Sequence, residues 1–267
     1  MVELDCSCSG HSNAKKKLSI KGEDVREYYD KVVGLIDSAF NINTVPTRLP
    51  IPCQVSDPLT KDVLLSIQDI TQVIELDSKT FLRLLEPSDG DVTAFYNIEN
   101  GIIFLDKEKW CINTLTHETL HSRSVFTKKP FSTNLEFVIE GLTELFAGFT
   151  FQRTLTECYT DWQTIDQCFH NNYEEYVKPW HYLHYKFDFL SIEQLFFNQN
   201  IQDPLKQLGV ILENNGCKGC VKLFSSYSKH RISFFQDFKD LIGRSFTSEF
   251  ADFMRTDLRE TIKLKEL

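Results

Sequence analysis

The sequence predicts an α+β fold in which a small mixed sheet in the first half is followed by a mainly helical second half. Three observations lead to this prediction. Strand-forming residues gather around one hairpin signal, apolar residues recur at helical spacing on both sides of that hairpin, and helical patterns dominate after residue 134. The 267 residues, of which 42% are hydrophobic and 25% charged, are enough for a buried core without a disulfide framework.

The segments before the hairpin combine three helical stretches with short extended ones. Apolar residues at helical spacing over residues 23–40 predict an amphipathic helix with an acidic first turn. Three closely spaced prolines favour an extended segment over residues 49–55. Residues 62–76 fit a helical stripe with an extended end, and residues 78–85 fit a short helix with Ser78 as its N-cap.

The hairpin is followed by two long helices. Residues 92–98 and 102–105 are rich in strand-forming side chains and flank an Asn-Gly dipeptide, which is typical of tight turns. Asp106 is a good N-cap, so we expect a helix from there to about Val125. Apolar spacing predicts a further helix over residues 134–154, and the rest of the chain indicates helices separated by Pro, Asn and Gly.

These elements suggest a division of the chain into three parts. Residues 1–21 form a polar N-terminal tail. Residues 22–127 form an α+β subdomain that contains the hairpin, and residues 128–267 form a mainly helical subdomain.

Charge and apolar pattern narrow the classes of partner. A formal net charge of −9 argues against a nucleic-acid binder, which needs clustered lysines and arginines to neutralise phosphates. No apolar run approaches the roughly 20 residues that span a bilayer. The chain starts with acidic and polar residues, without the basic start and apolar stretch of a secretory signal. We therefore expect a cytoplasmic protein without a membrane span, and its oligomeric state stays open.

Eight cysteines are spread along the chain, and in a reducing compartment we expect most of them to be thiols. Cys217 and Cys220 have the spacing of metal ligands, and Cys6 and Cys8 offer a second pair far away in the sequence. Two interpretations of Cys217 and Cys220 stay open: half of a metal or redox site, or an incidental turn with two thiols.

The residues that carry chemistry are His117, Glu118 and His121, which form an H-E-x-x-H motif inside a predicted helix. Residues four apart on a helix lie one turn above each other on one face, so both imidazoles can reach one metal ion at about 2.0–2.1 Å. Glu118 points beside that ion, where it can contact a metal-bound water. This is the arrangement of zinc hydrolases, and it predicts one catalytic Zn²⁺ ion.

Two glutamates of the next predicted helix extend the pattern. Glu140 follows His121 by 19 residues, Glu144 comes four residues later, and the two enclose the stretch E-G-L-T-E. This stretch and the motif together resemble the H-E-x-x-H … E-G-x-T-E pattern of thermolysin-like zinc metallopeptidases, the gluzincins. The resemblance implies a zincin-like fold, Glu140 as the third zinc ligand, and Glu144 as the carboxylate that accepts a hydrogen bond from a liganding histidine.

The hairpin upstream adds a second point of resemblance, which then extends over residues 92–150. Thermolysin-like enzymes carry an Ala-aromatic-aromatic edge strand beside the cleft, and Ala94, Phe95 and Tyr96 resemble it. The resemblance implies that this strand binds an extended substrate through its backbone. The alternative is an ordinary core strand.

Alternatives also stay open for the glutamate helix. Glu140 and Glu144 could form a solvated acidic face, although their apolar neighbours and the helix-weakening Gly141 favour burial. Close packing of this helix against the zinc helix would explain Gly141. Glu136, one turn earlier, could replace Glu140 as the ligand.

The predicted function is that of a zinc-dependent metallopeptidase acting on a peptide or protein substrate. The ion would lower the pKa of its water to about 7 and polarise the scissile carbonyl, and Glu118 would take the water's proton and pass it to the leaving amine. Two other classes stay open: a catalytically inactive zincin-fold binding protein, and a zinc hydrolase of a non-peptide amide or ester.

The family also uses a histidine or tyrosine from its helical part to stabilise the tetrahedral oxyanion. The sequence does not choose among the candidates, each of which can equally be a packing group. They are Tyr159, Tyr173, Tyr176, His181, Tyr182, His184, Tyr185 and His230.

Overall fold

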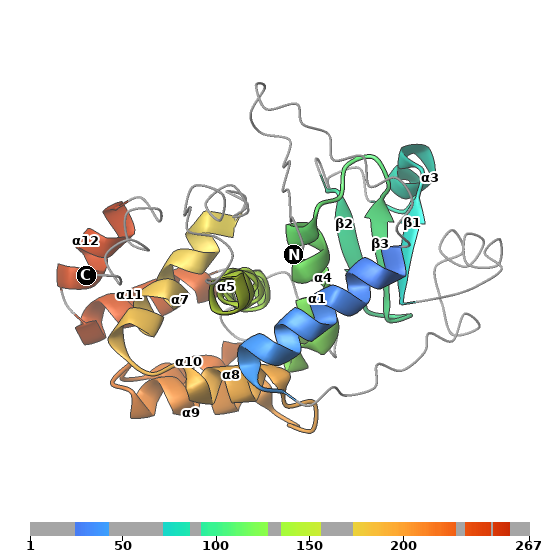
Figure 1. Ribbon diagram of the computed structural model, residues 1–267. Coiled ribbons are helices and arrows are strands. Elements are labelled where there is room, and N and C mark those ends of the chain that lie inside the picture. Colours follow the sequence, from blue (N-terminus) through green and yellow to red (C-terminus); the bar gives the residue numbers. More distant parts are fainter. Residues whose placement is uncertain are drawn as a thin grey trace. The chain divides into compact units, whose positions relative to one another are not determined.

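A computed structural model of the protein describes residues 25–42, 72–85, 92–127, 135–155, 173–227, 233–246 and 248–256. The described chain combines a three-stranded sheet with helices (Figure 1). Its elements are, in order, α1 (Val25–Phe40), β1 (Val73–Leu76), α3 (Ser78–Arg83), β2 (Ala94–Asn97), β3 (Ile102–Asp106), α4 (Ile112–Arg123), η2 (Val125–Thr127), α5 (Glu136–Leu155), α7 (Glu174–Lys186), α8 (Leu190–Phe197), α9 (Pro204–Asn214), α10 (Cys220–Ser225), α11 (Phe234–Phe246) and α12 (Ser248–Arg255). The predicted tail and the extended segment over residues 49–55 lie outside the described ranges.

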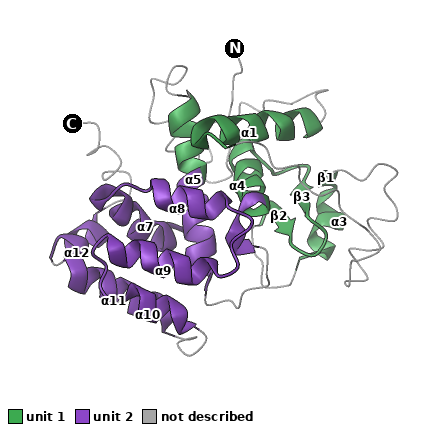
Figure 2. Ribbon diagram, turned by 90° about the horizontal axis from the view of Figure 1, so that it is seen from below, with its two compact units in different colours: residues 1–122, 147–169 green, residues 123–146, 170–267 purple. Residues whose placement is uncertain are grey.

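The chain groups into two compact units (Figure 2). The first consists of residues 1–122 and 147–169, and the second of residues 123–146 and 170–267. The border between the units falls inside α5, whose first part belongs to the second unit. The predicted subdomain border after residue 127 stays a prediction.

The sheet of the first unit is mixed, as the sequence predicts. Its strand order is β1-β3-β2, with β1 parallel and β2 antiparallel to β3. The Asn-Gly dipeptide closes the hairpin between β2 and β3, and Gly101 adopts a positive φ of 74° there, which suits a residue without a Cβ atom. The strand β1 confirms the extended end predicted for residues 62–76, whose earlier part lies outside the described residues.

The side chains of the strands point alternately to the two faces of the sheet. One face carries a core of buried apolar side chains that includes α3: Ile74, Leu76, Phe81, Ile102 and Phe104. Phe95 of β2 packs onto this core, with its ring centroid 5.1 Å from that of Phe104. Because successive side chains of a strand point to opposite faces, Ala94 and Tyr96 face the other side, where Tyr29 of α1 lies near Tyr96.

The starts of two helices differ from the predictions. Asp106 ends β3 instead of capping a helix, because its Oδ1 accepts hydrogen bonds from Ser78 Oγ at 2.6 Å and from Glu108 N at 3.1 Å. The bond from Glu108 N closes a turn, and α4 begins only after it. The N-cap of α3 is Asp77 rather than Ser78, since the Asp77 carboxylate accepts the backbone N–H of Thr80. An N-cap binds an N–H two or three residues later, and Asp77 is one residue better placed for this.

The second unit is helical, and aromatic side chains hold α5, α7 and α11 together. The Phe137 ring lies 6.2 Å from Trp180 and 5.2 Å from Phe238, measured between centroids. Trp180 Nε1 donates a hydrogen bond to Phe137 O at 2.7 Å, so the indole is satisfied although it is fully buried. None of the helices within the described ranges combines the length and apolar character that crossing a membrane requires.

Cys217 lies in the turn between α9 and α10, Cys220 is the first residue of α10, and a disulfide joins the two. Gly216 and Gly219 both have positive φ values, which suit a tight turn, and the Cα atoms of the two cysteines are 5.9 Å apart. This pair therefore departs from the expected thiols, whereas Cys111 is buried and in no disulfide, as expected. The predicted partners Cys6 and Cys8 lie outside the described residues.

Candidate metal centre

The helix α4 presents His117 and His121 to each other. Their Nε2 atoms are 2.9 Å apart, and the side chains are buried, with exposed fractions of 5% and 7%. The four-residue spacing gives this arrangement because it places both imidazoles on one face of the helix, one turn apart. Two facing ring nitrogens need a proton or a cation between them, since unprotonated nitrogens are both acceptors.

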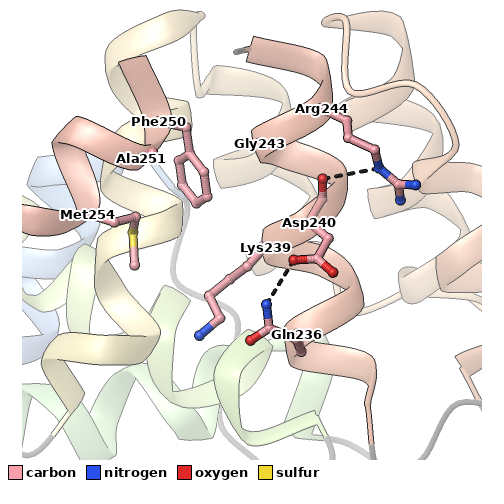
Figure 3. A pocket seen from close by; sticks show the side chains of 8 residues that line it. All are labelled: Gln236, Lys239, Asp240, Gly243, Arg244, Phe250, Ala251 and Met254. Carbon is pink, nitrogen blue, oxygen red and sulfur yellow. Dashed lines mark hydrogen bonds between the residues drawn. The ribbon is translucent and has the colours of Figure 1, made fainter. Parts of the chain in front are cut away.

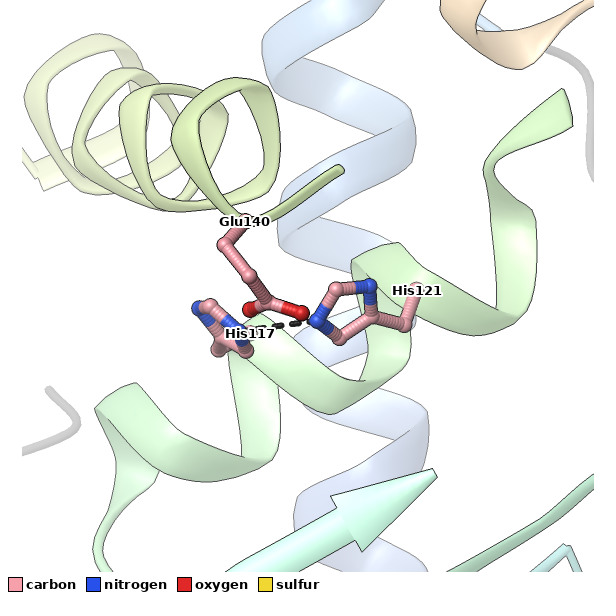
Figure 4. Close-up of side chains that lie close together, drawn as sticks. All are labelled: His117, His121 and Glu140. Atoms are coloured by element: carbon pink, nitrogen blue, oxygen red, sulfur yellow. Dashed lines mark hydrogen bonds between the residues drawn. The ribbon is translucent and has the colours of Figure 1, made fainter. Parts of the chain in front are cut away.

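Glu140 joins the two histidines. One oxygen of its carboxylate and one nitrogen of each imidazole all lie within 4.8 Å of one another, and Figure 4 shows the carboxylate directed toward both rings. Two imidazoles and one carboxylate are a ligand set that catalytic zinc sites use, with the fourth position left for water or substrate. His117, His121 and Glu140 are therefore able to hold a metal ion, and their chemistry fits Zn²⁺.

The three glutamates of α5 follow one helix face but differ in exposure. Glu136 is exposed, Glu140 is half-buried, and Glu144 has an exposed fraction of only 1%. A carboxylate as buried as Glu144 is retained only when a partner compensates its charge, so the solvated-face alternative does not fit it. The predicted hydrogen bond from a liganding histidine to Glu144 stays a prediction.

The close packing that explains a glycine at position 141 involves a different helix from the one we expected. A Cβ atom at this position would lie 2.7 Å from Tyr176 O and 2.7 Å from Trp180 Cδ1, both on α7. The close approach that the glycine predicts is thus present within the second unit, but its partner is α7 and not the helix of the H-E-x-x-H motif. Sequence reasoning chose the wrong partner because a glycine signals close contact without naming the neighbour.

Glu118 is half-buried on α4, next to His117 in sequence. Its Oε2 accepts a hydrogen bond from the backbone N–H of Tyr96 at 2.7 Å. This contact joins the candidate catalytic base to the predicted edge strand, and sequence reasoning missed it because the donor is a backbone group, which any residue type supplies. The one available signal was the alternation along the strand, which decides which backbone N–H groups point away from β3.

The side chains of the predicted substrate strand are mostly packed. Phe95 lies in the core beside α3, Ala94 is buried, and Tyr96 is half-buried on the opposite face. Burial raises the pKa of the Tyr96 phenol, and the nearby Tyr29 raises it further. Any contribution of this strand to substrate binding therefore falls to its backbone, and its side chains behave as those of a core strand.

Among the oxyanion candidates that the structure describes, Tyr176 interacts with two glutamates of α5, Glu136 and Glu140. Its hydroxyl donates a hydrogen bond to the Glu136 carboxylate. Burial raises the pKa of the Tyr176 phenol, and the negative charges of Glu136, Glu175 and Glu140 raise it further. For Glu136, partial burial and the charge of Glu140 raise the pKa, while the hydrogen bond from Tyr176 lowers it.

The other described candidates, on α7 or directly before it, make packing contacts. His181 stacks on Phe253, and His184 meets the ring of Phe189 edge-on. Tyr182 lies among three phenylalanines, and Tyr185 is exposed. Tyr173 stacks on Tyr176, and Tyr159 and His230 lie outside the described residues.

A pocket of the second unit lies between α11 and α12 (Figure 3). None of the predicted site residues lines it; the lining residues are Gln236, Lys239, Asp240, Gly243, Arg244, Phe250, Ala251 and Met254. Its polar side chains already have partners: Gln236 donates a hydrogen bond to Asp240 at 2.8 Å, and Lys239 forms an ion pair with Glu175 of α7 at 3.0 Å. The pocket thus offers no cluster of groups that would perform chemistry.

Comparison with known proteins adds no assignment to this geometry. No family model matches the sequence, and no curated protein and no solved structure matches it. The functional interpretation therefore depends on the side chains themselves.

Proposed function

We propose that the protein is a zinc-dependent metallopeptidase. The observation that carries the proposal is the cluster of His117, His121 and Glu140, and Glu118 directly follows His117 on α4. This combination brings a zinc-type ligand set together with an adjacent carboxylate that can move a proton. A bound Zn²⁺ ion would supply Lewis acidity, which activates water and polarises the scissile carbonyl.

The chain's own residues divide the remaining work. His117 and His121 offer their Nε2 atoms, and Glu140 offers a carboxylate oxygen. Glu118 takes the proton of the attacking water and delivers it to the leaving amine, for which its half-buried position leaves a path. Tyr176, whose raised pKa keeps the phenol protonated at neutral pH, is the described candidate for donating a hydrogen bond to the oxyanion, for which its hydroxyl would turn away from the Glu136 carboxylate.

The test combines metal content with peptide cleavage. Purified protein should contain one Zn²⁺ ion per chain by mass spectrometry and should cleave members of a peptide mixture. Chelation should abolish cleavage, and added Zn²⁺ should restore it. Zinc bound without any peptide cleavage would contradict the proposal, and parallel ester and amide substrates would then separate another hydrolase from a binding protein.

A matched pair of variants identifies the third ligand. Glu140→Gln should lose zinc, because an amide binds it far less well than a carboxylate. Glu136→Gln changes the same residue type one turn earlier on α5 and should keep zinc at one ion per chain. The opposite result, with zinc lost only in Glu136→Gln, would make Glu136 the ligand.

A further inference from the structure

The phase of β2 decides which of its backbone groups face away from β3. Thr93 O accepts a hydrogen bond from Asp106 N at 2.9 Å, and positions in an antiparallel pair alternate between hydrogen-bonded and non-hydrogen-bonded. In the observed register, Ala94 stands opposite Leu105. The backbone groups of residues 93, 95 and 97 therefore face β3, and those of Ala94 and Tyr96 face the opposite way.

The outward N–H of Tyr96 has its acceptor in the candidate active site. Within the described residues β2 is an edge strand of the sheet, so no further strand accepts this N–H there. The acceptor is Glu118 Oε2, at 2.7 Å. A hydrogen bond from an N–H to an ionised carboxylate is shorter and stronger than a neutral one, and this distance agrees with such a bond.

We propose that the backbone N–H of Tyr96 positions the catalytic base. By holding Oε2 of Glu118, the strand sets the plane of the carboxylate and hence the direction in which Oε1 points. A glutamate has three side-chain torsions, the last of them broad, so without this bond the carboxylate would sample more directions. Tyr96 acts through Glu118 and is a positioning residue. The catalytic part of this inference rests on the proposed peptidase function.

The same contact limits how an extended substrate can pair with β2. Since Glu118 accepts the N–H of Tyr96, strand addition is left with the N–H and C=O of Ala94 and the C=O of Tyr96. Ala94 therefore binds substrate, while the amide of Tyr96 orients the base. The amides of Ala94 and Tyr96 lie two residues apart on the same edge of the strand. Because their functions differ, substitutions at the two positions test the inference.

The first experiment needs no activity and uses the metal-free protein. Amide hydrogen exchange measured by NMR should show protection of the Tyr96 N–H, and Glu118→Ala should accelerate its exchange by about 10-fold or more, the worth of one hydrogen bond to a charged group. Glu118→Gln keeps an oxygen acceptor and should retain most of the protection. The exchange of the Ala94 N–H serves as the control and should not change. Equal exchange of Tyr96 in the wild type and Glu118→Ala would overturn the inference.

The second experiment removes the N–H itself. Tyr96→Pro deletes the donor at a position where the N–H faces away from the ladder, and edge strands tolerate proline there. Tyr96→Ala is the matched control for loss of the side chain. Relative to it, Tyr96→Pro should lower kcat by about 10-fold or more without a change in KM or in zinc content. Ala94→Pro should instead raise KM.

A double-mutant cycle completes the kinetic test. If the amide acts only through the base, Tyr96→Pro should have no further effect on kcat in the Glu118→Gln background. Equal kcat for Tyr96→Pro and Tyr96→Ala would overturn the inference, as would a full additive loss in the cycle. If Tyr96→Pro does not fold, the inference is tested by the amide exchange of Tyr96 in the wild type and in Glu118→Ala.

The outcomes separate this inference from the proposed function. A protein that shows the Tyr96 amide protection but cleaves no peptide contradicts the peptidase and leaves the bond between strand and Glu118 in place. A working zinc peptidase whose Tyr96 amide is indifferent to Glu118→Ala contradicts the positioning role alone.

Discussion

Two helices carry a pair of histidines, and the pairs differ in what surrounds them. On α4, His117 and His121 are four residues apart and bring their Nε2 atoms to 2.9 Å. On α7, His181 and His184 are three residues apart, with ring centroids 6.3 Å from each other, and each ring contacts a phenylalanine.

The comparison teaches that burial of a histidine is a poor sign of function. His181 has an exposed fraction of 8%, close to the 5% of His117. What distinguishes the α4 pair is the convergence of its nitrogens with a carboxylate oxygen of Glu140. Histidine pairs become metal ligands through such convergence, whereas aromatic neighbours make them packing groups.

The largest expected effect tests this comparison directly. Each of the four histidines is changed to phenylalanine, which keeps an aromatic ring and removes both nitrogens. His117→Phe and His121→Phe should weaken zinc binding by more than about 100-fold, since even the partners of ligands contribute about 10–100-fold. His181→Phe and His184→Phe should bind one zinc ion as the wild type does. Zinc titration with a competing chelator measures this.

Loss of zinc in either α7 variant would break the comparison, provided that circular dichroism shows a folded protein. Retention of tight zinc binding in both α4 variants would contradict the assignment of His117 and His121 as metal ligands.

An effect of intermediate size concerns the close packing of α7 against Gly141 of α5. Gly141→Ala forces a Cβ atom to within 2.7 Å of a backbone oxygen and an indole carbon of α7, so we expect a loss of about 1–3 kcal/mol in the free energy of unfolding. The control is Gly34→Ala in α1, where a Cβ atom meets nothing within 4 Å. That change should stabilise the protein by about 0.5–1 kcal/mol, because alanine favours a helix over glycine.

Denaturant unfolding of the two alanine variants checks the signs. If Gly141→Ala is as stable as Gly34→Ala, α7 does not need the close approach and its role as a tightly packed helix is wrong.

The smallest expected effect distinguishes Tyr176 from its neighbours on α7. Burial, followed by the charges of Glu136, Glu175 and Glu140, raises the pKa of the phenol. Glu136→Gln removes one of these charges and the hydrogen-bond acceptor of the ionised carboxylate. The pKa of Tyr176 should then fall toward its ordinary value of 10.0, because the phenolate is repelled less.

Phenolate absorbance measured against pH in the metal-free protein, with Tyr176→Phe subtracted, gives this pKa. An unchanged titration in Glu136→Gln would mean that the Tyr176 hydroxyl does not depend on Glu136.

Much of the first unit's fold could be predicted because its signals are local. An Asn-Gly dipeptide between two strand-forming runs specifies a hairpin, and four-residue spacing on a helix specifies that two imidazoles meet. Both predictions are confirmed in geometry, by the hairpin of β2 and β3 and by the facing nitrogens of His117 and His121. The proximity of Glu140 was predicted through a resemblance, since no local rule joins two different helices.

Two of the predictions that failed concern partners distant in sequence. Asp106 has the side chain of an N-cap, but Ser78, 28 residues away, donates a hydrogen bond to it and it ends a strand. Gly141 signals a close approach, yet only the fold shows that Trp180 is the neighbour. The bond from Tyr96 N to Glu118 has no residue signature at all, because every non-proline residue carries the same donor.

The zinc-loaded Glu118→Gln variant tests the central claim most directly. Its matched control is Glu108→Gln, which changes an exposed glutamate in the turn before α4. We expect both variants to bind one zinc ion per chain, and peptide cleavage to fall by about 10²–10⁴-fold in Glu118→Gln alone, as expected for loss of a general base. Cleavage by zinc-loaded Glu118→Gln at the rate of the wild type would contradict the account.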